Sequence, residues 1–448
     1  MRRDYVSRLM VGVSGVRGFF GDELTVDVAE RFAHAFGTLH PGIVVVGRDS
    51  RKSGQTLLGG VIGGLAKAGC RVIDLGIAAT PTVEMAVTAR DAAGGIIITA
   101  SHNPSEWNGL KFLGPDGVFL TGEECTAVIG LYDSPGDLDS SAVQSEVTAW
   151  VEADKHHLDA ILALDRIDRD LITEKKFTVC LDPNNGAGGP ICMKLLELLG
   201  CRIHVINGET TGDFAHDAEP VPENLDDICG LVREVGADIG FAVDPDVDRL
   251  SLVDERGDAP GEEYSLALAT EFVMSHGAES IACNLSTSRM VDDVAASHGG
   301  RVHRSPVGEI HVVEKMRETG APAGGEGNGG IILSELHPGR DAVLGIALIL
   351  QLLAERGKPL SALVDTIPRY HMIKVKTPIR EKDSWQEPVM YAFPEAEVDI
   401  LDGVKLILPD SWVHVRESNT EPVVRIIAEA PDKRAAQMLI IRVFEATG

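Results

Sequence analysis

A repeated unit of strand, helix and strand constrains the fold of this 448-residue sequence more than any other feature. Each copy begins with an apolar run typical of a buried strand, continues through a Gly/Ser-rich turn and a helical pattern, and ends at a glycine before a second strand. Such a βαβ unit predicts a parallel sheet with right-handed crossovers. The first strands are expected at residues 43–47, 177–181 and 280–284, and the second strands follow Gly69, Gly200 and Gly300.

The chain is long enough for several domains, since 448 residues exceed what one hydrophobic core usually organises. Residues 138–172 are charged, and we expect them to be mostly helical and to link the first two units. After residue 368 short strands alternate with turn signals before a final helix, which is typical of an antiparallel α+β domain. We therefore predict an α/β fold, with three similar mixed or parallel α/β domains around a central cleft and a C-terminal α+β domain. The expected domains span residues 1–152, 153–256, 257–368 and 369–448.

The composition narrows the range of partners. A formal net charge of −27 argues against nucleic acids and membranes, although a local cluster of arginines and lysines can still bind a small phosphorylated substrate. No apolar run reaches membrane-spanning length, and the charged amino terminus leads into no signal-peptide core. The seven cysteines form no Cys-x-x-Cys pair, so we expect reduced core residues. These features predict a cytoplasmic protein and leave its oligomeric state open.

Polar loops follow three apolar runs of the repeated units, at residues 99–104, 244–249 and 325–330. Ligands of parallel α/β sheets bind at the carboxyl ends of the strands, so these loops are expected to surround one cleft. In the first loop, Thr-Ala-Ser-His-Asn-Pro, Ser101 can act as a nucleophile or phosphate carrier if a base or a metal activates it. The alternative is an Asn-Pro turn without a catalytic role.

The second loop places Asp244, Asp246 and Asp248 at alternate positions. Hard oxygen ligands at this density suit Mg²⁺. A calcium EF-hand is an alternative, since Glu255 falls at the twelfth position, but Arg249 stands where that loop needs glycine and the flanking residues resemble strands. A solvated acidic turn fits less well, because the loop lies between apolar runs. We therefore favour a metal site.

Two further loops offer groups for a sugar and for a phosphate. The glycine-rich run 324–330 contains a carboxylate and an amide that fit vicinal hydroxyls, although glycine-rich turns are common. The run 416–422 offers hydroxyls, an amide and an arginine, which suit an anchored phosphate, and its alternative is a polar hairpin loop. An arginine in a glycine-rich loop near the amino terminus and a lysine after the serine loop complete the set. The candidates are Arg17, Lys111, Glu326, Asn328, Arg416, Ser418, Asn419, Thr420 and Arg425.

Four motifs, Thr-Ala-Ser-His-Asn-Pro, Asp-x-Asp-x-Asp-Arg, Gly-Glu-x-Asn-Gly and Arg-x-Ser-x-Thr-Glu-Pro, occur in this order and resemble those of the α-D-phosphohexomutase superfamily. The resemblance covers essentially the whole chain, and members of the superfamily interconvert 6-phospho and 1-phospho sugars. It implies a phosphoserine at Ser101 and a Mg²⁺ ion held by that phosphoserine and the three aspartates. It also implies sugar contacts from Glu326 and Asn328, and a phosphate clamp that contains Arg416, Ser418, Asn419, Thr420 and Arg425.

The implied reaction passes through a hexose 1,6-bisphosphate, which must turn around and return its other phosphate to Ser101. Arg17 and Arg249 would add positive charge near the transferred group, and either His102 or Lys111 would take the proton. One clamp would hold whichever phosphate is not transferred. A metal-dependent sugar phosphatase would not need that clamp, and a sugar-phosphate-binding protein without catalysis would not need the aspartates beside Ser101.

Two departures from common superfamily patterns bear on the sugar: Asn328 stands where serine is common and Gly330 where histidine is common. A third, Pro245 in place of a frequent glycine in the aspartate loop, should not affect metal ligation. The segment 306–309 and the Glu-Gly-Asn-Gly-Gly loop resemble phosphoglucosamine mutases. The expected reaction is therefore the conversion of glucosamine 6-phosphate to glucosamine 1-phosphate, with phosphomannomutase/phosphoglucomutase activity as the alternative.

Overall fold

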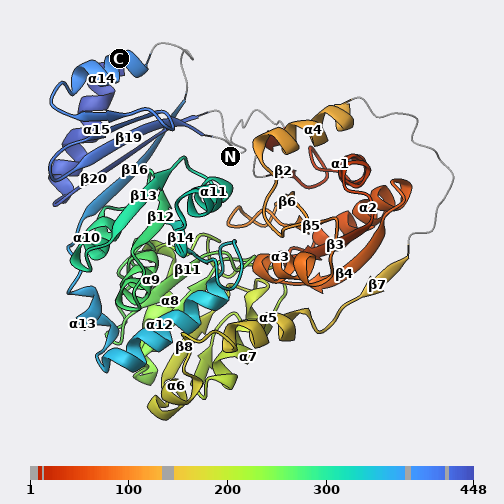
Figure 1. Cartoon of the computed structure of the whole chain (residues 1–448), viewed down its shortest axis with the longest axis horizontal. Coiled ribbons are helices and arrows are strands. Elements are labelled where there is room, and N and C mark those ends of the chain that lie inside the picture. Colours follow the sequence, from red (N-terminus) through yellow and green to blue (C-terminus); the bar gives the residue numbers. More distant parts are fainter. Residues whose placement is uncertain (1–8, 13–14, 134–145, 379–384, 419–422, 448) are drawn as a thin grey trace. The chain divides into compact units, whose positions relative to one another are not determined.

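The computed structural model describes residues 9–12, 15–133, 146–378, 385–418 and 423–447. It divides into two compact units, residues 1–265 with 328–364 and residues 266–327 with 365–448. Figure 1 shows the elements of both units, coloured along the chain. Within the described ranges, none of the helices combines the length and the apolar character that a bilayer crossing requires.

The amino-terminal part of the first unit contains a mixed sheet of order β1-β2-β6-β5-β3-β4-β7. Strands β3, β4, β5 and β7 pair in parallel, whereas β6, β2 and β1 continue the sheet antiparallel. Both β3 and β5 are buried apolar runs, as expected for strands covered on two faces. The elements are β1 (Met10–Gly12), β2 (Gly15–Phe19), α1 (Val26–Leu39), β3 (Ile43–Arg48), α2 (Gly54–Lys67), β4 (Arg71–Ile77), α3 (Thr80–Ala89), β5 (Gly94–Ile98), β6 (Trp107–Leu113), α4 (Gly122–Asp133) and β7 (Val147–Ala149).

The second part of this unit contains a sheet of order β11-β10-β8-β9, in which only β11 runs antiparallel to its neighbour. Helix α12 is buried along most of its length; the Asp341 side chain caps its first turn and Gly357 ends it at φ 60°. The elements are α5 (Ala153–Leu162), α6 (Arg169–Lys175), β8 (Thr178–Asp182), α7 (Gly188–Leu198), β9 (Arg202–Val205), the 3₁₀ helix η1 (Pro222–Asn224), α8 (Asp226–Val235), β10 (Ile239–Val243), β11 (Leu250–Val253), β15 (Gly330–Leu333), α12 (Ala342–Arg356) and α13 (Leu360–Val364). Helix α9 (Glu263–Ser275) runs across the boundary between the two units.

The second unit combines parallel strands in the order β13-β12-β14 with an antiparallel sheet of order β16-β20-β19-β18-β17. Helix α15 buries Ala436, Leu439, Ile440 and Val443, a helical spacing of apolar residues that faces the core. The elements are β12 (Ser280–Asn284), α10 (Met290–Ser297), β13 (Arg301–Ser305), α11 (Glu309–Thr319), β14 (Ala323–Glu326), β16 (His371–Pro378), α14 (Gln386–Ala392), β17 (Glu397–Asp399), β18 (Val404–Ile407), β19 (Trp412–Glu417), β20 (Val423–Ala430) and α15 (Lys433–Thr447).

The predicted fold class is confirmed, because three α/β parts with parallel strands precede a C-terminal antiparallel sheet. The prediction for residues 138–172 was incomplete: α5 and α6 are helical, but β7 is an exposed edge strand that pairs with β4. The β7 run has only three residues and all are exposed, which is too short for an alternating pattern to reveal a strand. All the cysteines are free thiols, and only Cys201 is more than slightly exposed.

Candidate active site

The predicted nucleophile Ser101 lies in the loop after β5. Its side chain is buried, and its backbone adopts a left-handed conformation. Its φ angle is 50°, a value that few residues other than glycine adopt. The Ser101 amide donates to the Thr99 hydroxyl over 2.9 Å, which helps to hold the turn. The Ser101 hydroxyl donates to Asp244 Oδ2 over 3.0 Å and lies 3.3 Å from His102 Nδ1. The serine therefore faces both a carboxylate and an imidazole.

Arg51, which was not predicted from the sequence, holds the serine loop by its carbonyl groups. Its guanidinium donates to the carbonyls of Ser101 and Asn103 over 2.5 Å and 2.7 Å. Asp49 pairs with Arg51 Nε over 2.9 Å and accepts from the Thr99 hydroxyl over 2.6 Å. The pair follows β3, which lies beside β5 in the sheet. A wider search of polar residues at strand ends would have found this pair.

The aspartate loop joins β10 to β11, and all three predicted carboxylates are fully buried. These flanking strands exclude the helices of an EF-hand. Asp244 Oδ1 accepts from the amides of Asp248 and Arg249 over 3.0 Å and 3.1 Å. Val247 has a φ of 67°, which is strained for a β-branched residue. The loop thus brings oxygens of Asp244, Asp246 and Asp248 within 4.8 Å of one another.

One oxygen of Asp246 and one oxygen of Asp248 accept hydrogen bonds from nearby cationic or hydroxyl side chains. Lys111 Nζ donates to Asp246 Oδ2 over 2.7 Å and to Asp248 Oδ2 over 3.1 Å. Arg340 Nη2 donates to Asp248 Oδ2 over 2.6 Å, and the Thr80 hydroxyl donates to Asp246 Oδ2 over 3.0 Å. Burial alone would lower the pKa of Lys111, but the two carboxylates raise it above its ordinary value. Lys111 is therefore charged in this arrangement.

The remaining oxygens of the loop fit a divalent cation. Among the described residues, Asp246 Oδ1 and Asp248 Oδ1 are buried without a hydrogen-bond donor. The pKa of Asp244 is raised well above its ordinary value by burial and by the charges of Asp248 and Asp246. A hard cation would relieve this repulsion, and carboxylate oxygens are the ligands that Mg²⁺ prefers. The residues present therefore fit Mg²⁺.

His102 and two arginines lie close to the serine and the aspartates. Burial and the charges of Arg249 and Arg17 keep the pKa of His102 well below its usual range, so its ring is neutral and can accept a proton. Burial lowers the pKa of Arg17 to about 10, which leaves this side chain charged at neutral pH. Arg249 Nε lies 3.7 Å from Asp248 Oδ1. These groups place positive charge around a polar site of low dielectric.

Arg340 also connects the aspartate loop with Asn328 of the glycine-rich loop. Its Nη1 lies 3.5 Å from Asn328 Oδ1, which also accepts from the Gly330 amide over 3.2 Å. A Cβ atom on Gly330 would come within 2.3 Å of Arg340 Cδ. The histidine that is common in the superfamily at this position would therefore collide with Arg340 as it lies here. The unusual glycine makes room for an arginine that contacts both loops.

In the second unit, Glu326 ends β14 and is 5% exposed. Its Oε1 accepts from Asn284 Nδ2 over 2.7 Å and from the Gly308 amide over 3.1 Å. The preceding amide, that of Val307, donates to Asp402 Oδ2 over 2.9 Å. The turn that holds Glu326 is thereby tied to the C-terminal domain.

The same oxygen of Asp402 also accepts from Arg416 Nε over 2.9 Å. Among the described residues, Arg416 Nη2 is buried without a hydrogen-bond acceptor. Burial lowers the pKa of Arg416, and the charge of Arg425, its partner across β19 and β20, acts in the same direction. A bound anion would pair with this donor and offset the repulsion between the arginines. The Ser418 amide donates to Val423 O over 2.8 Å, whereas Asn419 and Thr420 lie outside the described residues.

Comparisons with known proteins agree with this geometry. Family models described as Phosphoglucomutase/phosphomannomutase match successive parts of the chain: alpha/beta/alpha domain I at residues 8–136, domain II at 155–257, domain III at 260–370 and the C-terminal domain at 372–446. The chain belongs to the phosphoglucomutase/phosphomannomutase family. It is thus related to enzymes that are metal-dependent phosphosugar mutases, a class of isomerases.

Relatives in the phosphoglucomutase/phosphomannomutase family cover nearly the whole chain. A phosphoglucomutase/phosphomannomutase from Thermococcus kodakarensis is 36% identical over 449 residues and covers 96% of both chains. A probable phosphoglucosamine mutase from Methanopyrus kandleri is 36% identical over 435 residues and covers 96% of this chain and 95% of its own. Among solved structures, a family protein from Burkholderia thailandensis matches with a TM-score of 0.85 at 27% identity and covers 98% of this chain and 96% of its own.

Proposed function

We propose that this protein interconverts hexose 6-phosphates and hexose 1-phosphates, with glucosamine 6-phosphate to glucosamine 1-phosphate as its preferred reaction. The hydrogen bond from the Ser101 hydroxyl to Asp244 carries the proposal, since it joins a candidate phosphate carrier to a candidate cation site. Membership of the phosphoglucomutase/phosphomannomutase family supports the reaction class.

Ser101 carries the phosphoryl group in this proposal. A sugar hydroxyl attacks the phosphorus, the bond from phosphorus to the serine oxygen breaks, and a hexose 1,6-bisphosphate forms. After the bisphosphate turns around, the serine oxygen attacks its other phosphate and the isomeric monophosphate leaves. The serine is therefore phosphorylated at the start and at the end of each cycle.

Different groups around Ser101 would stabilise the charge of the phosphoryl group and transfer the proton. A Mg²⁺ ion bound by Asp244, Asp246, Asp248 and an oxygen of the phosphoserine would neutralise charge on the phosphoryl group. Arg17 and Arg249 add fixed positive charge beside it. His102, whose ring lies 3.3 Å from the Ser101 hydroxyl, and Lys111 are the two candidate carriers of the hydroxyl proton.

Residues of the later domains would bind the rest of the substrate. Glu326 and Asn328 would accept hydrogen bonds from the sugar. The non-transferred phosphate would be held by Arg416, Ser418, Asn419, Thr420 and Arg425. The buried Arg416 Nη2 supports this role, because among the described residues it has no hydrogen-bond acceptor.

Glucosamine is favoured by two features of the sugar loop. The Glu-Gly-Asn-Gly-Gly run resembles the loop of phosphoglucosamine mutases, and the Gly330–Arg340 arrangement departs from the histidine-containing loop. The test is turnover on glucosamine 6-phosphate, mannose 1-phosphate and glucose 1-phosphate, measured side by side. We expect the highest kcat/KM on glucosamine 6-phosphate, and a higher value on either neutral sugar would contradict the preference.

A sugar phosphatase is the second candidate, because it would use the same serine and metal. It differs in its product, since water rather than a sugar hydroxyl would take the phosphoryl group. We retain the domain ranges 1–152, 153–256, 257–368 and 369–448 and a cytoplasmic location as further proposals. The free cysteines support that location.

A further inference from the structure

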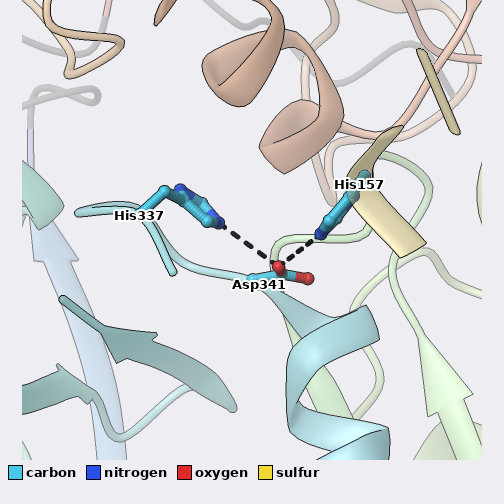
Figure 2. A group of neighbouring side chains, drawn as sticks. All are labelled: His157, His337 and Asp341. Carbon is cyan, nitrogen blue, oxygen red and sulfur yellow. Dashed lines mark hydrogen bonds and ion pairs between the residues drawn. The ribbon is translucent and has the colours of Figure 1, made fainter. Parts of the chain in front are cut away.

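A second buried group of metal-ligand side chains lies in the first unit, outside the aspartate loop (Figure 2). His157 belongs to α5, His337 lies in the turn after β15, and Asp341 caps α12. His157 and Asp341 are fully buried, and His337 is 7% exposed. None of the three has a role in the proposed phosphoryl transfer. We propose that His157, His337 and Asp341 bind a transition-metal ion of the zinc type.

The donor set and the distances suit such an ion. Both rings point Nε2 at the same oxygen of Asp341, from 2.7 Å for His157 and 3.2 Å for His337. Zinc with bonds near 2.0–2.1 Å holds its tetrahedral donors about 3.3 Å apart. The His337 contact already has this spacing, and the His157 contact needs to open by roughly half an ångström. Two imidazoles and a carboxylate favour zinc over Mg²⁺, which prefers oxygen ligands.

Two of the three ligands are oriented by hydrogen bonds behind them, and Glu84 lies behind the third. His157 Nδ1 lies 2.9 Å from the Thr82 hydroxyl, and His337 Nδ1 lies 3.3 Å from Glu84 Oε2. Metal-bound histidines commonly donate their second ring N–H to such oxygens, which fixes the tautomer and the ring. Asp341 Oδ1 accepts from the amides that start α12, so Oδ2 faces the rings. His157 and Asp341 are thus pre-oriented, and the ring of His337 has a carboxylate within ion-pair distance of its second nitrogen.

The charges of the cluster favour a cation. Glu84 and Asp341 bring two carboxylates into the protein interior, where their negative charge is costly unless a protonated His337 or a cation balances it. A divalent ion would balance both while the two imidazoles stay neutral. The ion would tie α3 and α5 to the turn before α12. Arg340, the residue before Asp341, contacts Asp248 of the aspartate loop, so this centre would also steady that loop.

Zinc uptake by the full-length protein tests the proposal. The chelator-treated protein is titrated with Zn²⁺ in competition with a chromophoric chelator and in excess Mg²⁺, which occupies the oxygen site. We expect one tightly bound Zn²⁺ per chain, and a tetrahedral visible spectrum when Co²⁺ replaces it. His157→Gln and His337→Gln should weaken binding at least about 100-fold, and Glu84→Gln about 10- to 100-fold. His156→Gln is the matched control, because His156 is the exposed neighbour of His157.

Two results would overturn the proposal. One is the absence of Zn²⁺ uptake beyond what Mg²⁺ displaces. The other is unchanged Zn²⁺ affinity in the folded His157→Gln and His337→Gln variants. Either would leave the cluster a metal-free hydrogen-bonded network, with His337 protonated between Glu84 and Asp341. If the histidine variants do not fold, the Zn²⁺ affinity of Glu84→Gln and the Co²⁺ spectrum of the wild type test the proposal instead. An octahedral Co²⁺ spectrum would contradict the proposed zinc site. None of these measurements depends on catalysis. An absence of the proposed mutase activity would therefore be detected in a separate assay and would not affect the zinc result.

Discussion

The Ser101 hydroxyl donates to Asp244 Oδ2 over 3.0 Å, although 143 positions separate the two residues in the sequence. Each residue lies in a loop that follows a buried strand, β5 for Ser101 and β10 for Asp244. The parallel α/β architecture brings such loops together at strand ends. Phosphoryl transfer at Ser101 and cation binding at Asp244 are thus expected to depend on each other.

Asp246→Asn should lower mutase activity at least roughly 100-fold, because the variant loses one negatively charged ligand for the cation. The fold should persist, since asparagine can still accept from Lys111 and the Thr80 hydroxyl. The loss of activity is measured over a Mg²⁺ titration, and the stability of the fold is measured by thermal unfolding without Mg²⁺. Asp258→Asn, at an exposed carboxylate on the same part of the chain, is the control. A variant that retains full activity in a chelator would show that the loop holds no catalytic metal.

Arg51→Ala should damage both stability and catalysis. Removing Arg51 leaves Asp49 as an unpaired buried charge, which typically costs about 3–5 kcal/mol in the free energy of unfolding. It also frees the carbonyls of the serine loop, and misplacement of Ser101 by about 1 Å can reduce the rate roughly 100-fold. Urea unfolding and kcat are the measurements, with Lys52→Ala at the neighbouring exposed lysine as the control. Wild-type kcat in Arg51→Ala would rule out a positioning role.

Arg416→Ala should weaken binding of the 1-phosphate and of the 6-phosphate alike. In the proposed mechanism one anchor serves both half-reactions, and loss of a desolvated arginine–phosphate contact typically costs about 2–5 kcal/mol. Titration of each monophosphate into phosphorylated, Mg²⁺-loaded protein measures the effect, with the exposed Arg442→Ala as the control. Phosphorylation of Ser101 and Mg²⁺ affinity should not change. If only one isomer loses affinity, two separate phosphate sites must exist.

Lys405 should make the stability of the protein rise with pH above neutrality. Burial and the nearby charge of Arg304 lower its pKa to about 7 from the ordinary value of 10.5. Between these values the unfolded chain binds a proton that the folded chain lacks, so the free energy of unfolding increases with pH. Lys405→Met should remove a slope of about 1.4 kcal/mol per pH unit. Urea unfolding at pH 7.5 and 9.5 measures this slope in both proteins, and equal slopes would contradict the prediction.

The fold and the candidate site residues could be predicted because their signals are local. Ser101 and the three aspartates lie in short motifs directly after apolar runs. A strand followed by a polar loop can be recognised within about ten residues of sequence. Arg51, Thr80 and Arg340 stand in no such motif, although Arg51 follows β3 and a wider search of strand ends would have found it. Each is an ordinary polar residue in the sequence, and its importance comes from contacts with residues 50 to 166 positions away.

The same limit applies to the histidine cluster. His157 and His337 lie in segments with no metal-binding spacing, and only the packing of α5 against the turn before α12 brings them to Asp341. Gly330 illustrates the reverse case. Its departure from the superfamily pattern was visible in the sequence, but the reason, the path of Arg340, required the structure.

The most direct measurement follows the fate of phosphate in wild type and in Ser101→Ala. Glucosamine 6-phosphate is incubated with each protein, Mg²⁺ and a trace of hexose 1,6-bisphosphate, and the products are followed by ³¹P NMR. We expect wild type to form glucosamine 1-phosphate without inorganic phosphate, and Ser101→Ala to lose roughly a thousandfold or more of this rate, because the phosphoryl carrier is gone. Isomer formation at the wild-type rate by Ser101→Ala, or release of inorganic phosphate as the main product of the wild type, would contradict a mutase that works through Ser101.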